Sequence, residues 1–329
     1  MISSLSLQNF RNYTKKEFEF GEKTLIVGEN GVGKTNILET IYLLATGKSF
    51  RADRDSELIT YDCQFAIVKS DGLQITITDR PPSPHGFGGA SKKFEVNGIP
   101  RRQMDFVGKM RAVLFAPQDM ELITGSPSHR RKYLDFVICQ MDREYRRCLI
   151  SYEKGLRQRN KLLSLIRDGL ASRTQLYFWD KLLIKNGDYI TLKRGEYLQN
   201  LSGDYQPVYD KSIITEDRLK QYEVEEVAAA TTLVGPHRDD FIINFNGRDV
   251  SKYGSRGEQR MAVLWLKTGE IKYLGDDPIL LLDDIFSELD QKHRELVSSL
   301  VRDYPGQVIA TTADEHLLSE MKEYQIINL

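Results

Sequence analysis

The first 120 residues alternate apolar and polar positions in short runs, a pattern that indicates a sheet-rich region. Turn-forming residues separate the runs, and we expect the stretch 80–90, with its prolines and glycines, to be an exposed loop. The predicted strands are 2–7, 14–20, 24–27, 65–69, 72–78, 93–100 and 111–116.

The pattern changes to a helical one after Ser126 and Pro127, which are typical of a helix start. Apolar residues then recur at steps of three and four from position 134 to 156, which predicts one long amphipathic helix. A second helical pattern covers 176–201, and the polar stretch 167–174 with Gly169 turns the chain between them. Two helices with a short link predict an antiparallel arm. Packing in a core would explain the apolar stripe equally well.

A mixed pattern returns after residue 226, with a strand at 241–245, a helix at 261–274 and strands at 278–284 and 307–311. We therefore predict an α/β protein in which residues 1–122 and 230–329 form one discontinuous domain. Residues 123–229 would be a helical arm inserted into it.

Residues 28–35 match the phosphate-binding pattern G-x-x-x-x-G-K-[ST] at every fixed position, between a predicted strand and a predicted helix. Ile37, Ile41 and Leu44 fall on one face of that helix. Glycines let backbone N–H groups surround an anion at the helix start. We expect Lys34 to reach the β- and γ-phosphates of ATP and Thr35 to hold Mg²⁺. The predicted ATP-binding residues here are Gly28, Glu29, Asn30, Gly31, Val32, Gly33, Lys34, Thr35 and Asn36.

The strand at 278–284 is an apolar run that ends in two carboxylates, as expected of a central parallel strand. Ligands of open α/β sheets bind at the carboxyl ends of strands. We therefore expect Asp283 to bind Mg²⁺ together with Thr35, and Asp284 to orient or deprotonate the attacking water. A strand followed by an acidic helix cap is the alternative.

Net charge is 46 − 47 = −1, but the charge is unevenly distributed. Residues 127–161 hold ten basic and four acidic residues, whereas residues 276–329 hold four basic and twelve acidic ones. A local basic stripe suits a phosphate-backbone partner, although a solvated helix face explains each single residue as well. Cys63, Cys139 and Cys148 show neither metal-ligand nor disulfide spacing. With no apolar run of membrane-spanning length and no secretory signal, we expect a cytoplasmic protein without a membrane partner.

Three further segments narrow the class to ABC-type ATPases. Residues 255–259 resemble the signature sequence, in which Ser255, Gly257 and Gln259 would face the ATP of a second subunit. Gln118 follows an apolar run where that class carries a metal- and water-contacting glutamine, so the predicted metal ligands are Thr35, Gln118 and Asp283. Residues 287–290 resemble the loop that crosses the dimer interface. The order of these segments along the chain indicates the ABC class more specifically than any single segment does.

The chain resembles the RecF family of bacterial recombination mediators, which is related to SMC head domains, from its first strand to its last. The segments that carry the resemblance are 7–12, 28–36, 48–51, 117–119, 125–131, 235–240, 255–260 and 281–290. The Gly-Ser-Pro…Arg-Arg and Gly-Pro-His-Arg-Asp-Asp segments are the most specific. The insertion of about a hundred residues is far shorter than the coiled coils of SMC proteins.

The resemblance implies an ATP-dependent homodimer that binds double-stranded DNA, with a preference for duplex beside single-stranded gaps. It also implies slow, DNA-stimulated ATP hydrolysis, RecA loading with RecR and RecO, and a role for Arg11 in binding ATP. Two positions depart from the ABC pattern. Thr311 or Thr312 stands where many members carry a histidine, with His316 further on, and Asp284 replaces the usual glutamate.

We expect DNA contacts from basic residues on the first helix and on the N-terminal domain. An equal alternative for Arg130 and Arg131 is packing at the base of the arm. Another SMC-like or ABC-class ATPase outside gap repair is the alternative function, while a transporter, a long SMC clamp and a metabolic kinase each lack support. We expect His237 to be structural. The candidate DNA contacts are Arg130, Arg131, Arg143, Arg146, Arg147, Lys92 and Lys93.

Overall fold

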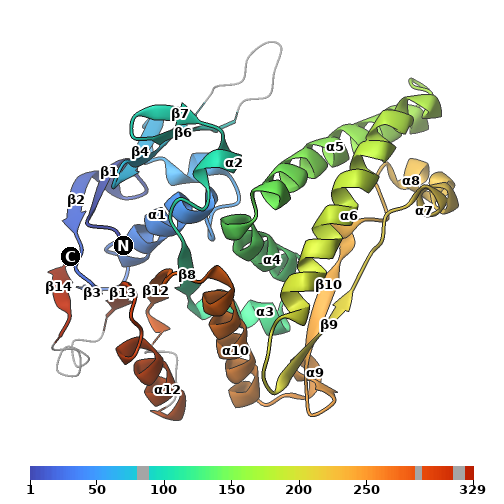
Figure 1. Cartoon of the computed structure of the whole chain (residues 1–329). Coiled ribbons are helices and arrows are strands. Elements are labelled where there is room, and N and C mark those ends of the chain that lie inside the picture. The colour runs from blue at the N-terminus through green and yellow to red at the C-terminus, as the bar shows by residue number, and fades with distance from the viewer. Residues whose placement is uncertain (80–88, 286–290, 314–322) are drawn as a thin grey trace. The chain divides into compact units, whose positions relative to one another are not determined.

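The computed structural model describes residues 1–79, 89–285, 291–313 and 323–329 (Figure 1). The chain divides into two compact units, Met1–Asp119 with Glu270–Leu329 and Met120–Gly269. The second unit therefore also contains residues 230–269, which the sequence analysis assigned to the discontinuous domain. Pairing explains this difference, because β10 (Asp240–Phe245) pairs antiparallel with β9 (Tyr205–Asp210).

A five-stranded parallel sheet in the first unit has the order β14-β3-β13-β12-β8. It consists of β3 (Lys23–Val27), β8 (Ala112–Phe115), β12 (Ile279–Asp283), β13 (Val308–Thr312) and β14 (Gln325–Asn328). The predicted strands at 24–27, 111–116, 278–284 and 307–311 are confirmed. Every residue of β12 is buried, as the uninterrupted apolar run indicates.

A six-stranded antiparallel sheet of the same unit has the order β2-β1-β4-β5-β6-β7. Its strands are β1 (Ser4–Phe10), β2 (Tyr13–Glu19), β4 (Phe65–Ser70), β5 (Leu73–Thr78), β6 (Ser91–Val96) and β7 (Ile99–Arg101). The prediction of one strand over 93–100 is wrong. Asn97 and Gly98 both have positive φ, 52° and 74°, and turn the chain into a tight hairpin between β6 and β7.

Helix α1 (Lys34–Thr46) contacts β8, β12 and β13 of the parallel sheet and also β5 of the antiparallel one. The sequence predicted Ile37, Ile41 and Leu44 on one face, and all three are buried, but Leu38 and Leu43 are equally buried. A helix that is covered on several sides needs no polar face. Among the described residues, the other helices of this unit are η1 (Asp55–Leu58), α2 (Gln103–Phe106), η2 (Pro117–Met120) and α12 (Gln291–Arg302). The last residue of η2, Met120, belongs to the second unit.

The second unit contains the two long helices of the predicted arm, α5 (Arg143–Arg167) and α6 (Tyr177–Gln199), which lie side by side (Figure 1). The prediction of one continuous first helix is wrong, because α4 (Pro127–Met141) ends at Asp142. The backbone of Asp142 is extended (φ −102°, ψ 107°), and its side chain accepts a hydrogen bond from the Tyr145 amide to cap α5.

A three-stranded sheet in the order β11-β10-β9 completes the second unit, and the sequence reading missed β9. Helix α10 (Arg256–Leu274) starts five residues earlier than predicted. None of the described helices is long and apolar enough to cross a membrane. The remaining elements are α3 (Glu121–Thr124), η3 (Arg173–Leu176), α7 (Glu216–Gln221), α8 (Glu223–Ala229), η4 (Pro236–Arg238), β11 (Arg248–Asp249) and α9 (Val250–Tyr253).

Candidate nucleotide site

The loop between β3 and α1 has the backbone geometry of a phosphate-binding loop. Gly31 and Gly33 have φ of 88° and 116°, values that favour glycine. Helix α1 has no side-chain cap and no acidic residue in its first turn. Its positive dipole end is therefore available to an anion.

Lys34 extends over this loop instead of into solvent. Its side chain is buried, and Nζ donates hydrogen bonds to the carbonyl oxygens of Gly28 at 2.6 Å and Glu29 at 2.9 Å. The ammonium group thus lies inside the curve of the loop, where a triphosphate would exchange these carbonyls for phosphate oxygens.

Thr35 and Asp283, 248 residues apart in the sequence, meet at the carboxyl edge of the parallel sheet. The Thr35 hydroxyl donates to Asp283 Oδ1 at 2.8 Å. Strand β13 separates β3 from β12, and its Thr311 hydroxyl donates to the same oxygen at 2.9 Å. Burial raises the pKa of Asp283, while the bonds from Thr35 and Thr311 act against that shift. A hydroxyl and a carboxylate are oxygen ligands of the kind that Mg²⁺ prefers, so the residues present fit this ion.

Asp284 and Gln118 lie near the same edge. The backbone amide of Asp284 donates to the Thr311 hydroxyl at 3.0 Å, and its φ of 47° is unusual for a non-glycine residue. Gln118 is exposed in η2, directly after β8, which is the neighbour of β12. The hydroxyl of Thr311 is engaged with both aspartates and therefore links β13 to the end of β12. Thr312 is buried.

Arg11 forms a bidentate ion pair with the buried Glu39 of α1, through Nε at 2.9 Å and Nη2 at 2.7 Å. The predicted ATP-binding residue thus anchors the N-terminal strands to the helix that follows the loop. Next to it, Asn12 donates to the Val32 carbonyl at 2.8 Å and accepts from the Asn36 amide at 2.8 Å. These contacts hold Val32 of the loop and Asn36 in the first turn of α1.

Arg51 belongs to this site but was not among the predicted site residues. Its Nη1 donates to Asn36 Oδ1 at 3.1 Å, and its charge acts to lower the pKa of Asp283. The Ser49 hydroxyl accepts from the Arg51 amide at 2.9 Å and donates to Glu39. The Lys-Ser-Phe-Arg segment had appeared only as part of the family resemblance, and nothing in its composition indicates its position.

The signature segment begins α10 in the second unit. Ser255 and Glu258 form a capping box, with the Ser255 amide donating to Glu258 Oε2 at 2.7 Å and the Glu258 amide to Ser255 Oγ at 3.3 Å. These bonds lower the pKa of Glu258. Ser255 is exposed, and Gln259 Nε2 donates to the Val250 carbonyl at 3.2 Å. The S-x-x-E spacing is the sequence pattern of a capping box and could have predicted this role of Glu258.

Three of the seven candidate DNA contacts are bonded within the protein; Arg130 and Arg146 are buried and Lys92 is partly buried. Arg130 pairs with Asp240 through two hydrogen bonds, at 2.6 and 3.0 Å, and donates to the Gly125 carbonyl at 2.8 Å. Lys92 donates to Asp55 at 2.7 Å and Gly47 at 2.8 Å, and burial lowers its pKa. Arg146 donates to the carbonyl of Cys139. For Arg130 the structure favours the alternative of packing.

The other four candidates differ in exposure. Arg131 is half-buried and donates to the Asp239 carbonyl at 2.8 Å. Arg143 is exposed, Arg147 pairs with Glu144 of its own helix at 2.6 Å, and Lys93, whose side chain is 60% exposed, pairs with Glu95 at 3.0 Å. Surface pairs of this kind exchange readily for phosphate partners.

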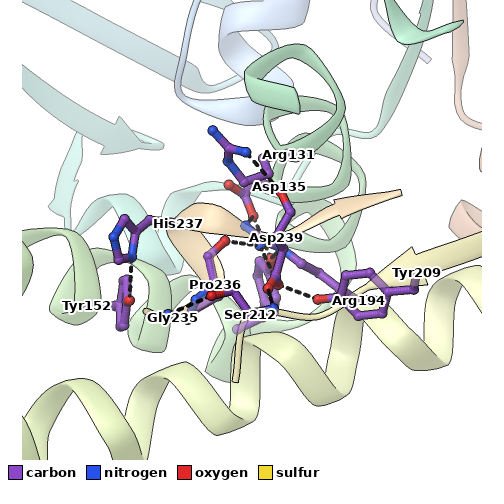
Figure 2. A network of polar contacts seen from close by, with 11 residues as sticks. Arg131, Asp135, Tyr152, Arg194, Tyr209, Ser212, Gly235, Pro236, His237 and Asp239 are labelled. Atoms are coloured by element: carbon purple, nitrogen blue, oxygen red, sulfur yellow. Dashed lines mark hydrogen bonds and ion pairs between the residues drawn. The ribbon is translucent and has the colours of Figure 1, made fainter. Parts of the chain in front are cut away.

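The Gly-Pro-His-Arg-Asp-Asp segment contributes Asp239 to a buried polar network of the second unit (Figure 2). Asp239, fully buried, accepts hydrogen bonds from Arg194 at 3.1 Å, from the Ser212 amide at 2.7 Å and from the Tyr209 hydroxyl. Arg194 also pairs with Asp135 of α4 at 2.9 Å. The segment therefore ties α4, α6 and the approach to β10 together.

His237 of this segment hydrogen-bonds the Tyr152 hydroxyl through Nδ1 at 2.8 Å (Figure 2). It also hydrogen-bonds the Thr232 carbonyl through Nε2 at 3.0 Å. Burial lowers its pKa to about 4. These contacts agree with the expectation of a structural histidine. The predicted crossing loop at 287–290 and His316 lie outside the described residues.

Comparison with known proteins identifies the family of this chain. The model of the RecF/RecN/SMC N terminal domain matches residues 1–328. The DNA replication and repair protein RecF of Lachnoclostridium phytofermentans is 36% identical over 325 residues, covering 92% of this chain and 90% of that protein. The protein of the same name from Shouchella clausii is 35% identical over 364 residues, covering 97% and 96%.

A solved structure described as the recombination mediator protein RecF-ATP in the RecFOR pathway is similar over 95% of this chain and 92% of that chain. Its TM-score is 0.81 at 32% sequence identity. These relatives do not favour the alternative of an ABC-class ATPase outside repair. The chain is therefore an ABC-type ATPase that belongs to the RecF family of DNA replication and repair proteins.

Proposed function

We propose that this chain binds ATP and Mg²⁺ at the loop 28–35 and uses slow hydrolysis to control a homodimer on DNA. The observation that carries the proposal is the 2.8 Å hydrogen bond between Thr35 and Asp283, because these two residues are the metal ligands that the reaction needs. The RecF-ATP relative supports the choice of nucleotide. Bound Mg²⁺ would neutralise charge on the β- and γ-phosphates.

The protein's own residues have separate tasks in this scheme. Lys34 binds phosphate oxygens, and Thr35 and Asp283 hold the metal. Gln118, just after β8, contacts the metal and the attacking water. Asp284 orients or deprotonates the attacking water. An aspartate reaches less far than the usual glutamate, which suits a slow ATPase that times dimer dissociation.

The dimer follows from the signature segment. Ser255 and Gly257 stand at the start of a 19-residue helix, whose positive end attracts the γ-phosphate held by a second copy. The triphosphate supplies this attraction and the diphosphate does not, so hydrolysis weakens the dimer. Two copies double the number of phosphate contacts to DNA and make binding steeply salt-dependent.

We further propose double-stranded DNA beside single-stranded gaps as the substrate, RecR with RecO as partners, and the cytoplasm as the location. The name of the RecFOR pathway for the structural relative supports the partners. The candidate DNA contacts whose exposure suits this role are Arg143 and Lys93, which are exposed, and Arg147, which is partly exposed.

Light scattering with ADP and with a slowly hydrolysed ATP analogue tests the proposal. We expect a monomer with ADP and a dimer with the analogue. A mass that does not respond to the triphosphate, in protein that binds it, would exclude the two-subunit site.

A further inference from the structure

The hydroxyl of Tyr13 lies buried beside the phosphate loop and has no hydrogen-bond partner among the described residues. Tyr13 begins β2, directly after Asn12 in the turn that follows β1. A Cβ atom on Gly33 would lie 2.7 Å from this hydroxyl oxygen. The hydroxyl therefore occupies the space where a side chain at Gly33 would lie, one residue before Lys34.

The surroundings explain the ring of Tyr13 but not its hydroxyl. The ring packs edge-on against Phe18, with centroids 5.8 Å apart, a contact that phenylalanine would make equally well. The neighbouring Asn12 side chain is already paired, since it bonds to Val32 and Asn36. Burial raises the pKa of Tyr13 to about 12, so at neutral pH the hydroxyl keeps its proton and can donate it.

An unpaired buried hydroxyl destabilises a protein relative to the same side chain without it. Unsatisfied polar groups in folded proteins are rare and often mark functional positions. Here the group lies against Gly33 of a loop that is suited to phosphate oxygens, which are strong hydrogen-bond acceptors. A bound nucleotide would supply the acceptor that the protein itself lacks at this point.

We propose that the Tyr13 hydroxyl donates a hydrogen bond to bound nucleotide, at the part that ATP and ADP share. Tyr13 lies on the side of Asn12 and Asn36, whereas the γ-phosphate and Mg²⁺ belong at Asp283 on the sheet edge. The inference rests on the proposed binding of ATP to the loop 28–35. It gives the turn between β1 and β2 a direct role in binding.

Calorimetric titration of the full chain with ADP and with a slowly hydrolysed ATP analogue tests this contact in Tyr13→Phe. We expect affinity for both nucleotides to fall about tenfold, the equivalent of about 1.4 kcal/mol. In the nucleotide-free protein we expect Tm to stay equal or to rise, because the variant removes an unpaired polar group.

Thr60→Val is the matched control, since Thr60 also has a buried hydroxyl oxygen without a partner but lies outside the loop. It should leave both affinities unchanged. Wild-type affinity in Tyr13→Phe, a loss for the triphosphate alone, or a lower Tm would each overturn the inference. Failure of the wild-type protein to bind either nucleotide would instead remove the proposed function, and this inference with it.

Discussion

Replacing Arg130 with alanine separates a structural role from DNA binding, because the structure gives this arginine a well-defined partner. Its side chain is 9% exposed and that of Asp240 is 24% exposed, with two hydrogen bonds between them. Breaking a buried pair costs about 3–5 kcal/mol, and breaking an exposed one less than about 1 kcal/mol. Partial exposure of Asp240 places the expected loss between these limits, at about 2–3 kcal/mol.

The assay is urea unfolding followed by circular dichroism, with thermal unfolding as a second measure. A loss of this size lowers Tm by about 4–12 °C at 2–4 °C per kcal/mol. Arg147→Ala is the control, since its pair with Glu144 joins exposed neighbours on one helix and should change stability by less than about 1 kcal/mol.

A double-mutant cycle makes the test specific to the pair. Asp240→Ala should cost less in the Arg130→Ala background than in the wild type, because the ion pair is already broken. If Arg130→Ala unfolds at the same urea concentration as the wild type and yet loses DNA affinity, the structural assignment is refuted. Arg130 would then belong with the exposed arginines.

Four further predictions concern the nucleotide site, the signature segment and pH. Lys34→Met should abolish nucleotide-driven dimerisation in light scattering. Ser255→Arg should still bind ATP in calorimetry but stay monomeric. A dimer of Ser255→Arg would contradict the two-subunit site. Glu258→Gln keeps the capping geometry but removes a negative charge from the start of α10, so we expect a tighter triphosphate-dependent dimer at low salt, and an unchanged dissociation constant would show that this charge is irrelevant. Because His237 titrates near pH 4 when folded and near 6.5 when unfolded, the unfolded chain binds more protons between these values, and stability should fall by up to about 1.4 kcal/mol per pH unit as the pH drops through that window. His237→Gln should reduce that slope in urea titrations at pH 7, 6 and 5, and an unchanged slope would assign the effect to other groups.

The parallel sheet and its phosphate loop could be predicted because local patterns determine them. A buried strand, a glycine loop and a helix follow one another from residue 23 to 46, and β12 is a single apolar run ending at Asp283. Parallel topology then brings the two ends together, as the contact of Thr35 with Asp283 shows. Roles in catalysis stay predictions for all of these residues.

The break at Asp142 could not be predicted from periodicity, because the apolar positions continue in phase across it. Capping of α5 by the Asp142 side chain is a local polar effect that an apolar stripe does not report. The hairpin at Asn97 and Gly98 did carry a readable turn signal, Asn-Gly, which the strand prediction overrode.

Buried arginines are the clearest limit of sequence reasoning here. A count of charges gives the sign of a segment but not the partners of its members. Arg130, Arg146 and Arg159 all lie within the basic stretch, and each is at least nine-tenths buried. Arg159 makes two ion pairs, with Asp180 and with Glu226, both at 2.7 Å. Part of the basic excess that suggested DNA binding is therefore neutralised by ion pairs and hydrogen bonds inside the protein.

The strand order of the parallel sheet has a consequence for biosynthesis. Strand β3 leaves the ribosome early, yet both of its neighbours, β13 and β14, are made after residue 307. At about 5–20 residues per second, β3 waits roughly 15–60 s for a pairing partner. The second unit is one continuous stretch, Met120–Gly269, so it can fold during that interval. A nascent chain stalled before β12 would carry the whole phosphate-loop sequence and still be unable to assemble the site.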